Sequence, residues 1–359
     1  MRGGWASTHV CGVWQALRST LIDVAREAGV SSATVDRVLN GRVGVRPRTR
    51  EAVLSAATRL GYIVGTPVEN TTADAALPIV TVDIVLPAGT NSFMLRLGNE
   101  LRAQASDRTD IEARIHLIEG FNPNTLASKL GELEGRSAAV GLVAIDHPTV
   151  RDAIVGLARS GVPIVTLVSD IQHVPREGYV GIDNRTAGRL AGYVLSRFLG
   201  KGRHKVALLA GSVSYRGHEE REMGFRHIVS EHADQLEVVA FSEIRDDDDR
   251  AYAAASQHLQ QHQDLSAIYN IGAGNRGIAR ALREAGRAND VVFIGHDLTE
   301  YTKEYLLTGV MDAVIDQNPR VEARDALEQL SRVARGLLFN VHPLRTQIIF
   351  RENLPEEYS

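Results

Sequence analysis

Residues 20–62 read TLIDVAREAGVSSATVDRVLNGRVGVRPRTREAVLSAATRLGY and contain the signals of three short helices. The first helix is expected to start at Thr20, which suits a helix N-cap, and to end at Gly29, which tolerates a positive φ. Ser31 is the expected N-cap of the second helix, and Pro47 suits the first turn of the third because its φ is already helical. The stretch therefore predicts a small all-α unit.

The second of these helices has one apolar and one polar face. Val35, Val38 and Leu39 share the apolar face, which must pack against the other helices. The opposite face carries Ser32, Ala33, Asp36 and Arg37. Three short helices with a glycine in the first turn are typical of a helix-turn-helix, whose second helix enters the major groove of DNA.

The charge of this stretch favours DNA binding over the alternative, a small helical bundle of another kind. From Arg18 to Tyr62 there are eight arginines, no lysine and four acidic residues, a net charge of +4. The whole chain carries −4, so the remainder is acidic. A basic unit on an acidic body indicates a polyanion partner, because phosphate contacts supply most of the non-specific affinity for DNA.

Residues 20–64 resemble the DNA-binding domain of the lactose/galactose repressor family. The resemblance is carried by DVAREAGVS at 23–31, TVDRVLN at 34–40, and a helix that contains TREAV at 49–53 and ends LGY at 60–62. It implies a transcriptional regulator, expected to be a repressor, that binds a palindromic operator as a homodimer in the cytoplasm.

The residues expected to contact DNA are Ser32, Ala33, Thr34, Asp36, Arg37, Asn40 and Arg50. Arg37 is the best candidate to bind a guanine through two hydrogen bonds, and Ala33 is placed to meet a thymine methyl. Thr34, Asn40 and Arg50 are expected to contact phosphates. Asp36 stands where the family mostly has serine, and it either accepts a hydrogen bond from a cytosine amine or repels the phosphates.

Composition bounds the rest of the chain. A length of 359 residues suggests two or three domains, and 44% hydrophobic residues is ordinary for a soluble globular protein. The single cysteine, Cys11, excludes a disulfide or a multi-cysteine zinc site within one chain, which fits a reducing compartment. Residues 1–19 lack the continuous apolar core of a signal peptide and are left as an unassigned N-terminal extension.

Residues 65–78 are rich in small and turn residues and are expected to form a linker. In the repressor family this position usually holds a short basic hinge helix that places a leucine in the minor groove. Residues 73–77 include Asp74 and no basic residue, which favours a plain tether over a hinge helix with Leu77 as that leucine.

From Ile79 onward, short β-branched runs alternate with helical segments. This alternation predicts βαβ units, and hence parallel sheets with helices on both faces. The predicted strands are 79–87, 111–118, 140–145, 162–168, 205–210, 236–241, 267–271 and 291–295, with a further strand ending near Asp316. Ligands of such sheets bind at the carboxyl ends of the strands, so the polar residues directly after each run are candidates for a site.

Residues 79–359 resemble the periplasmic sugar-binding-protein fold that forms the effector domain of the same family. The segments that carry this resemblance are TNSFM from 90, YVGIDNRTAGRLAGYVL from 179, REMGF from 221, IGHDLT from 294, DAVIDQNP from 312 and RENLP from 351. The resemblance implies two doubly wound subdomains, approximately 79–182 with 318–340 and 183–317 with 341–359, that close on a small polar effector, expected to be a sugar or polyol.

Carried over position by position, the resemblance implies effector contacts from Asn91, Phe93, Asp170, Arg221, Asn275, Asp297 and Gln317. Carboxylates, amides and a guanidinium recognise hydroxyl groups, and an aromatic ring covers a C–H face. The alternatives are structural: Asp170 and Asp297 as helix caps, Arg221 in a surface ion pair, and Phe93 as a core residue. The family's Asp-Arg pair after the fourth strand is replaced here by Val168-Ser169-Asp170, which argues against ordinary aldose specificity.

Two other functions are alternatives. Gly272, Gly274 and Gly277 form a G-x-G-x-x-G pattern after a strand, which would suit an NAD(P)-dependent oxidoreductase. A solute-binding protein of transport would need an export signal and no helix-turn-helix. His258 and His262 lack a third metal ligand at a diagnostic spacing, and residues 245–250, RDDDDR, are expected to be an exposed loop. We therefore expect a regulator that is not an enzyme and has no cofactor or metal.

Overall fold

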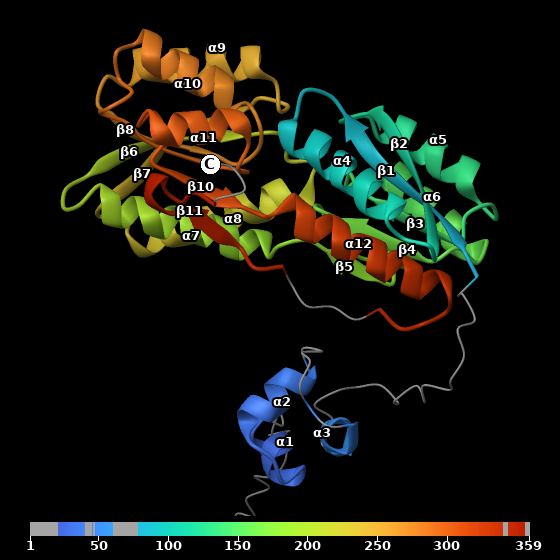
Figure 1. Cartoon of the computed structure of the whole chain (residues 1–359). Coiled ribbons are helices and arrows are strands. Elements are labelled where there is room, and N and C mark those ends of the chain that lie inside the picture. The colour runs from blue at the N-terminus through green and yellow to red at the C-terminus, as the bar shows by residue number, and fades with distance from the viewer. Residues whose placement is uncertain (1–20, 40–44, 46, 60–77, 340–343, 356–359) are drawn as a thin grey trace, which may run out of the picture. The chain divides into compact units, whose positions relative to one another are not determined.

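The computed structural model describes residues 21–39, 45, 47–59, 78–339 and 344–355, and the chain separates into two units, residues 1–75 and 76–359 (Figure 1). Thr20, Asn40, the extension at 1–19 and the linker up to Leu77 lie outside the described residues. The predictions made for them stay predictions.

The first unit contains the three predicted helices, α1 (Leu21–Glu27), α2 (Ser32–Leu39) and α3 (Pro47–Arg59). Gly29 has a φ of 65°, and the Ser31 Oγ accepts a hydrogen bond of 3.2 Å from the Thr34 N–H. A turn glycine and a serine N-cap thus separate α1 from α2, as expected. The core of the unit is built by Val24, Ala25, Val35, Val38, Val53, Ala56 and Ala57.

The second unit has two lobes, each built on one sheet. In lobe 1 all neighbouring strands are parallel, in the order β2-β1-β3-β4-β5. Its strands are β1 (Val80–Ala88), β2 (Ile111–Glu119), β3 (Ala139–Leu142), β4 (Ile164–Leu167) and β5 (Gly178–Val180). Helices α4 (Ser92–Ser106) and α12 (Pro319–Ala334) pack together on the sheet, as do α5 (Pro123–Leu133) and α6 (Pro148–Arg159).

Lobe 2 has the strand order β11-β10-β9-β8-β6-β7, with β11 antiparallel to β10 and the other pairs parallel. Its strands are β6 (His204–Ala210), β7 (Leu236–Glu243), β8 (Leu265–Asn270), β9 (Val292–His296), β10 (Ala313–Asp316) and β11 (Gln347–Ile349). Its helices are α7 (Asn184–Phe198), α8 (Arg216–Glu231), α9 (Asp248–Gln261), α10 (Asn275–Glu284) and α11 (Glu300–Leu307), and a 3-10 turn, Arg351–Asn353, follows β11.

The chain passes between the lobes more than once. It leaves lobe 1 after β5 to form α7, and it returns after β10, because α12 packs into the lobe 1 core through Ala323, Leu327 and Leu330 (Figure 1). The structure confirms the predicted α/β fold with two largely parallel sheets. Strands β5 and β11 were not predicted, because three residues are too few to show a periodic pattern.

The G-x-G-x-x-G pattern has a packing explanation. Gly274 adopts a φ of 94° at the start of α10. A Cβ at Gly277 would lie 1.9 Å from the backbone oxygen of Asp248, and a Cβ at Gly272 would lie 2.5 Å from the Asp246 Oδ1. The glycines are thus required because α10 approaches α9 and the loop before it closely.

We predict that Gly277→Ala lowers the free energy of unfolding by about 2–3 kcal/mol, because the added methyl forces α10 away from α9. Urea unfolding followed by circular dichroism measures the change. The matched control is Gly131→Ala in α5, where an added Cβ meets no atom within 4 Å. Gly131→Ala should leave the free energy of unfolding unchanged or raise it by about 0.5–1 kcal/mol. Equal losses of stability in the two variants would contradict the packing explanation.

Candidate functional site

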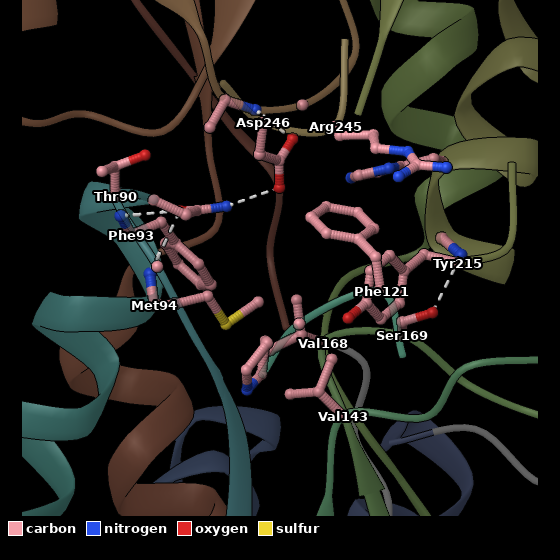
Figure 2. Close-up of a pocket in the computed structure, with 18 of the residues that line it drawn as sticks. Thr90, Phe93, Met94, Phe121, Val143, Val168, Ser169, Tyr215, Arg245 and Asp246 are labelled. Atoms are coloured by element: carbon pink, nitrogen blue, oxygen red, sulfur yellow. Dashed lines mark hydrogen bonds between the residues drawn. The ribbon is translucent and has the colours of Figure 1, made fainter. Parts of the chain in front are cut away.

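A cleft of about 500 Å³ lies where the carboxyl ends of the two sheets meet. Lobe 1 lines it with the segments that follow β1, β2, β3 and β4, and lobe 2 with those that follow β6, β7, β8, β9 and β10. Figure 2 shows side chains from both lobes pointing into this space. The position agrees with the rule that ligands bind at the carboxyl edge of parallel strands.

Asn91 connects the two sides of the cleft. It caps α4, because its Oδ1 accepts hydrogen bonds from the Phe93 N–H at 3.0 Å and the Met94 N–H at 3.2 Å. Its Nδ2 donates across the cleft to the Asp246 Oδ2 at 2.9 Å (Figure 2). Phe93 is buried and also lines the cleft. The cap fixes the direction of the Asn91 amide, so this side chain is preorganised to contact a bound molecule.

Asp297 and Gln317 form a polar pair in the wall of the cleft. The Gln317 Nε2 donates to the Asp297 Oδ1 at 2.9 Å, and both side chains are buried. Burial raises the pKa of Asp297 to about 7, although the nearby Arg221 acts in the opposite direction. The Gln317 Oε1 has no hydrogen-bond partner, which leaves an acceptor beside the cleft. The pair therefore offers hydrogen bonds to hydroxyl groups.

Arg221 is only 3% exposed, yet it reaches the cleft from α8. Its Nε donates to the Asn184 Oδ1 at 2.7 Å, and its Nη1 donates to the Ile271 backbone oxygen at 2.9 Å. These bonds hold the guanidinium in one orientation. The predicted residues that the structure brings together in the cleft are Asn91, Phe93, Arg221, Asp297 and Gln317.

Asp170 and Asn275 lie outside this set. Asp170 pairs with Arg176, whose Nε donates to its Oδ1 at 2.7 Å, and it does not line the cleft. Asn275 donates from Nδ2 to the His296 backbone oxygen at 3.1 Å and lines a small neighbouring cavity of about 30 Å³. After β4 it is Val168 and Ser169 that line the cleft, two positions and one position before the residue expected there.

Asp246 corrects the expectation that residues 245–250 are only an exposed loop. Arg245 and Asp246 have φ values of 52° and 55°, and both line the cleft (Figure 2). The Asp246 Oδ1 accepts a hydrogen bond of 2.9 Å from the Ala273 N–H, which fixes the carboxylate in place. These residues follow β7, so the rule that selected the other candidates would have found them as well.

Further cleft residues come from the loop after β2, from α8 and from the loop directly before α8. Phe121 and Tyr215 meet edge to face, with ring centroids 5.2 Å apart. His218 lines the cleft, its Nδ1 accepts from the Ser212 N–H at 3.0 Å, and burial lowers its pKa. The sequence showed no signal for Phe121 and Tyr215, because an isolated aromatic residue in a loop does not differ from a core residue.

In the first unit, Ser32 and Arg37 are exposed on α2, whereas Val35 and Val38 are buried. Thr34, Asp36 and Arg50 are partly buried, and the Thr34 Oγ1 lies 2.9 Å from the Ser31 Oγ within the cap. The Ala33 side chain and Asn40 lie outside the described residues. Arg37 is therefore the described basic residue of α2 that points away from the core.

Within the described parts of the chain, no group of three or more His, Cys, Asp and Glu side chains is arranged to hold a metal ion. His258 is buried, with its Nε2 2.8 Å from the Ser242 Oγ. No described helix is both long enough and apolar enough to span a membrane.

The chain resembles known proteins over both units. Residues 20–64 match the lacI family of bacterial regulatory proteins, and residues 82–337 match the periplasmic binding protein domain family. Catabolite control protein A of Priestia megaterium is 26% identical over 286 residues, 78% of this chain and 82% of the relative. The ribose import binding protein RbsB of Salmonella typhimurium is 24% identical over 261 residues, 71% of this chain and 85% of the relative.

The same architecture occurs in the glucose-galactose binding protein GanP of Geobacillus stearothermophilus. The two structures superpose with a TM-score of 0.70 at 23% sequence identity, covering 77% of this chain and 99% of the other. At this identity the similarity shows a common fold.

We predict that the stability gained by Asp297→Asn grows with pH. The folded pKa lies above the ordinary value, so between about pH 4 and 7 the folded chain holds an extra proton. Raising the pH through this window releases that proton and lowers the free energy of unfolding. Asparagine cannot ionise and tolerates the φ of 68° found at Asp297.

Urea unfolding of the wild type and Asp297→Asn at pH 5 and pH 8 measures this effect. The variant should gain about 1–3 kcal/mol relative to the wild type between the two pH values. A difference that stays constant with pH would show that Asp297 keeps an ordinary pKa.

Proposed function

The chain belongs to the lacI family of bacterial regulatory proteins through residues 20–64 and to the periplasmic binding protein domain family through residues 82–337, and from this premise we propose how it acts. It binds a pseudo-palindromic operator as a homodimer, and a small sugar or polyol in the cleft controls that binding. The cytoplasm is its place of action, because that is where the operator DNA lies. The protein acts by binding DNA and effector, without a catalytic step.

The hydrogen bond between Asn91 and Asp246 is the observation that carries the effector part of the proposal. It joins the lobes at 2.9 Å through side chains that both line the cleft. A polyol placed between them can accept from the amide and donate to the carboxylate, so it would bind both lobes at once. Ligand binding would thereby favour one arrangement of the lobes, as a regulator requires.

Helix α12 supports a connection between the cleft and the DNA-binding unit. Directly before this helix, Gln317 contacts Asp297 in the cleft wall. Directly after it, the Arg335 Nη2 donates to the Pro78 backbone oxygen at 3.1 Å and to the Asp110 backbone oxygen at 2.7 Å. Pro78 is the last residue of the predicted linker and the first one that the structure describes after α3. A shift of α12 on effector binding would therefore be transmitted to Pro78. The effector would then change the affinity for DNA, and DNA would change the affinity for the effector by the same factor.

The relatives favour a sugar or polyol, since they include proteins named for ribose import. A transport function alone would leave residues 20–64 without a role. The oxidoreductase alternative rested on the glycine pattern, for which close packing of α10 on α9 is a sufficient reason.

We predict different effects for two arginines of the first unit. Selection from a random duplex pool should enrich an inverted repeat, because one unit reads only a half-site. On that operator Arg37→Ala should lose about 1–3 kcal/mol of discrimination against a changed base pair. Arg50→Ala should weaken binding to all sequences about equally. It should also reduce the slope of log affinity against log salt concentration by about one, the value for one lost phosphate contact.

Fluorescence anisotropy at several salt concentrations distinguishes these effects. Failure to enrich any repeat, with folded protein at low salt, would count against the operator. Unchanged base preference in Arg37→Ala would remove Arg37 from the recognition face.

We predict that Asp246→Asn weakens effector binding by about tenfold, because a neutral amide replaces a charged acceptor. Asparagine tolerates the positive φ at this position, so folding should be retained. Asp249→Asn is the matched control, since Asp249 is exposed and does not line the cleft. Calorimetry should show the loss only for Asp246→Asn, with operator affinity in the absence of effector unchanged. Equal effector affinity in both variants would exclude Asp246 from the site.

A further inference from the structure

We propose that the effector is a sugar that carries a deoxy carbon or methyl group, and that Val168 selects it. This inference rests on the proposed function and names the class of ligand more closely. The observations behind it are the backbone of Val168, the hydrogen bonds that hold that backbone, and the chemistry of the surrounding wall.

Val168 lies directly after β4 and has a φ of 60°. The Ser169 N–H donates to the Leu167 backbone oxygen at 2.5 Å, which closes a three-residue turn around Val168. A β-branched residue rarely adopts a positive φ, because its branched side chain collides with the backbone. This strained backbone conformation places the Val168 side chain in the cleft wall. Backbone strain of this kind occurs mostly at functional sites.

Both polar backbone groups of Val168 are held by hydrogen bonds. Its N–H donates to the Val180 backbone oxygen at 2.9 Å and to the Glu322 Oε1 at 3.1 Å. Its carbonyl accepts from the Tyr179 hydroxyl at 2.9 Å and from the Asn184 Nδ2 at 3.3 Å. Glu322 is fully buried in α12, and this burial raises its pKa well above the ordinary value. The neighbouring elements therefore fix the position of the Val168 side chain.

The lobe 1 wall around Val168 is apolar. Val143 and Val168 lie toward one end of the pocket in Figure 2, with Phe93 and Met94 to one side and Phe121 to the other. Ser169 is the polar neighbour, and its Oγ already accepts a hydrogen bond of 3.2 Å from the Gly217 N–H.

Lobe 2 lines the cleft with charged and polar side chains. Asp246 and Arg245 lie toward the opposite end of the pocket in Figure 2, and Arg221 and His218 also belong to lobe 2. A ligand that fits both walls needs hydroxyl groups on one edge and an apolar group on the other.

The apolar side chains around Val168 favour the binding of some sugars over others. A hydroxyl group packed against the side chains of Val143 and Val168 would lose its water without gaining a hydrogen bond from them, which is unfavourable. A methyl or methylene group at the same position would be removed from water and would contact the valine methyl groups, which is favourable. Val168 thus acts as a specificity-determining residue, and the polar groups of lobe 2 orient the remaining hydroxyls.

The test is calorimetry of the full-length protein with matched pairs of sugars. The pairs are D-fucose with D-galactose, 6-deoxy-D-glucose with D-glucose, L-rhamnose with L-mannose, and 2-deoxy-D-ribose with D-ribose. In at least one pair the deoxy sugar should bind about tenfold tighter or more. If every sugar that binds does so at least as well in its hydroxylated form, the inference is overturned and the sugar assignment stands. If no sugar binds, the sugar assignment fails together with the inference.

Variants test the role of Val168 directly. Val168→Thr keeps the β-branched shape but turns a hydroxyl toward the cleft, so the preference for the deoxy sugar should fall about tenfold. Val165→Thr is the control, because Val165 is fully buried in β4 and does not line the cleft. It should keep the wild-type preference.

Val168→Asn tolerates the positive φ and should shift the preference toward the hydroxylated sugar, which covers the case in which Val168→Thr does not fold. An unchanged preference in a folded Val168 variant would overturn the assignment of this residue.

Discussion

A parallel sheet must be covered on both faces by the helices that connect its strands, and this constraint shapes the larger unit. The helices occupy the faces of both sheets, so the loops at the carboxyl ends are left to form a site. Two such sheets with their carboxyl ends facing one another produce the cleft of about 500 Å³. The chain passes between the lobes repeatedly, so the two walls of the cleft are covalently connected at more than one place.

Strained backbone conformations and buried carboxyl groups are concentrated in and behind the cleft. Of the seven described non-glycine residues with positive φ, five line it: Phe121, Val168, Arg245, Asp246 and Asp297. Asp297 is buried in the cleft wall and Glu322 behind it in α12, bonded to the Val168 N–H, and burial raises the pKa of both. Both features cost stability, and the rest of the unit offsets that cost with large apolar cores in each lobe. Residues that lower the stability of the fold are typically concentrated in this way at binding sites.

Residues that line the cleft were predicted where their position depends on strand ends and missed where it depends on the geometry of single turns. Asn91, Asp297 and Gln317 follow strands directly, so the parallel-sheet rule located them. Asp170 was chosen two positions too late, because the turn around Val168 presents the valine instead. Asp246 was set aside as part of an acidic loop, although two successive positive φ values turn it into the cleft.

By itself the sequence determined the three-helix unit, the exposure of Ser32 and Arg37 on α2, and the parallel α/β architecture, since caps, periodicity and strand spacing are local signals. It did not determine β5 or β11, whose pairing depends on partners far along the chain. Only the tertiary structure decided which side chains face the cleft, that Asn91 meets Asp246, and that Val143 and Val168 lie toward the end of the cleft opposite Asp246. These properties depend on contacts between residues more than a hundred positions apart, which no local pattern specifies.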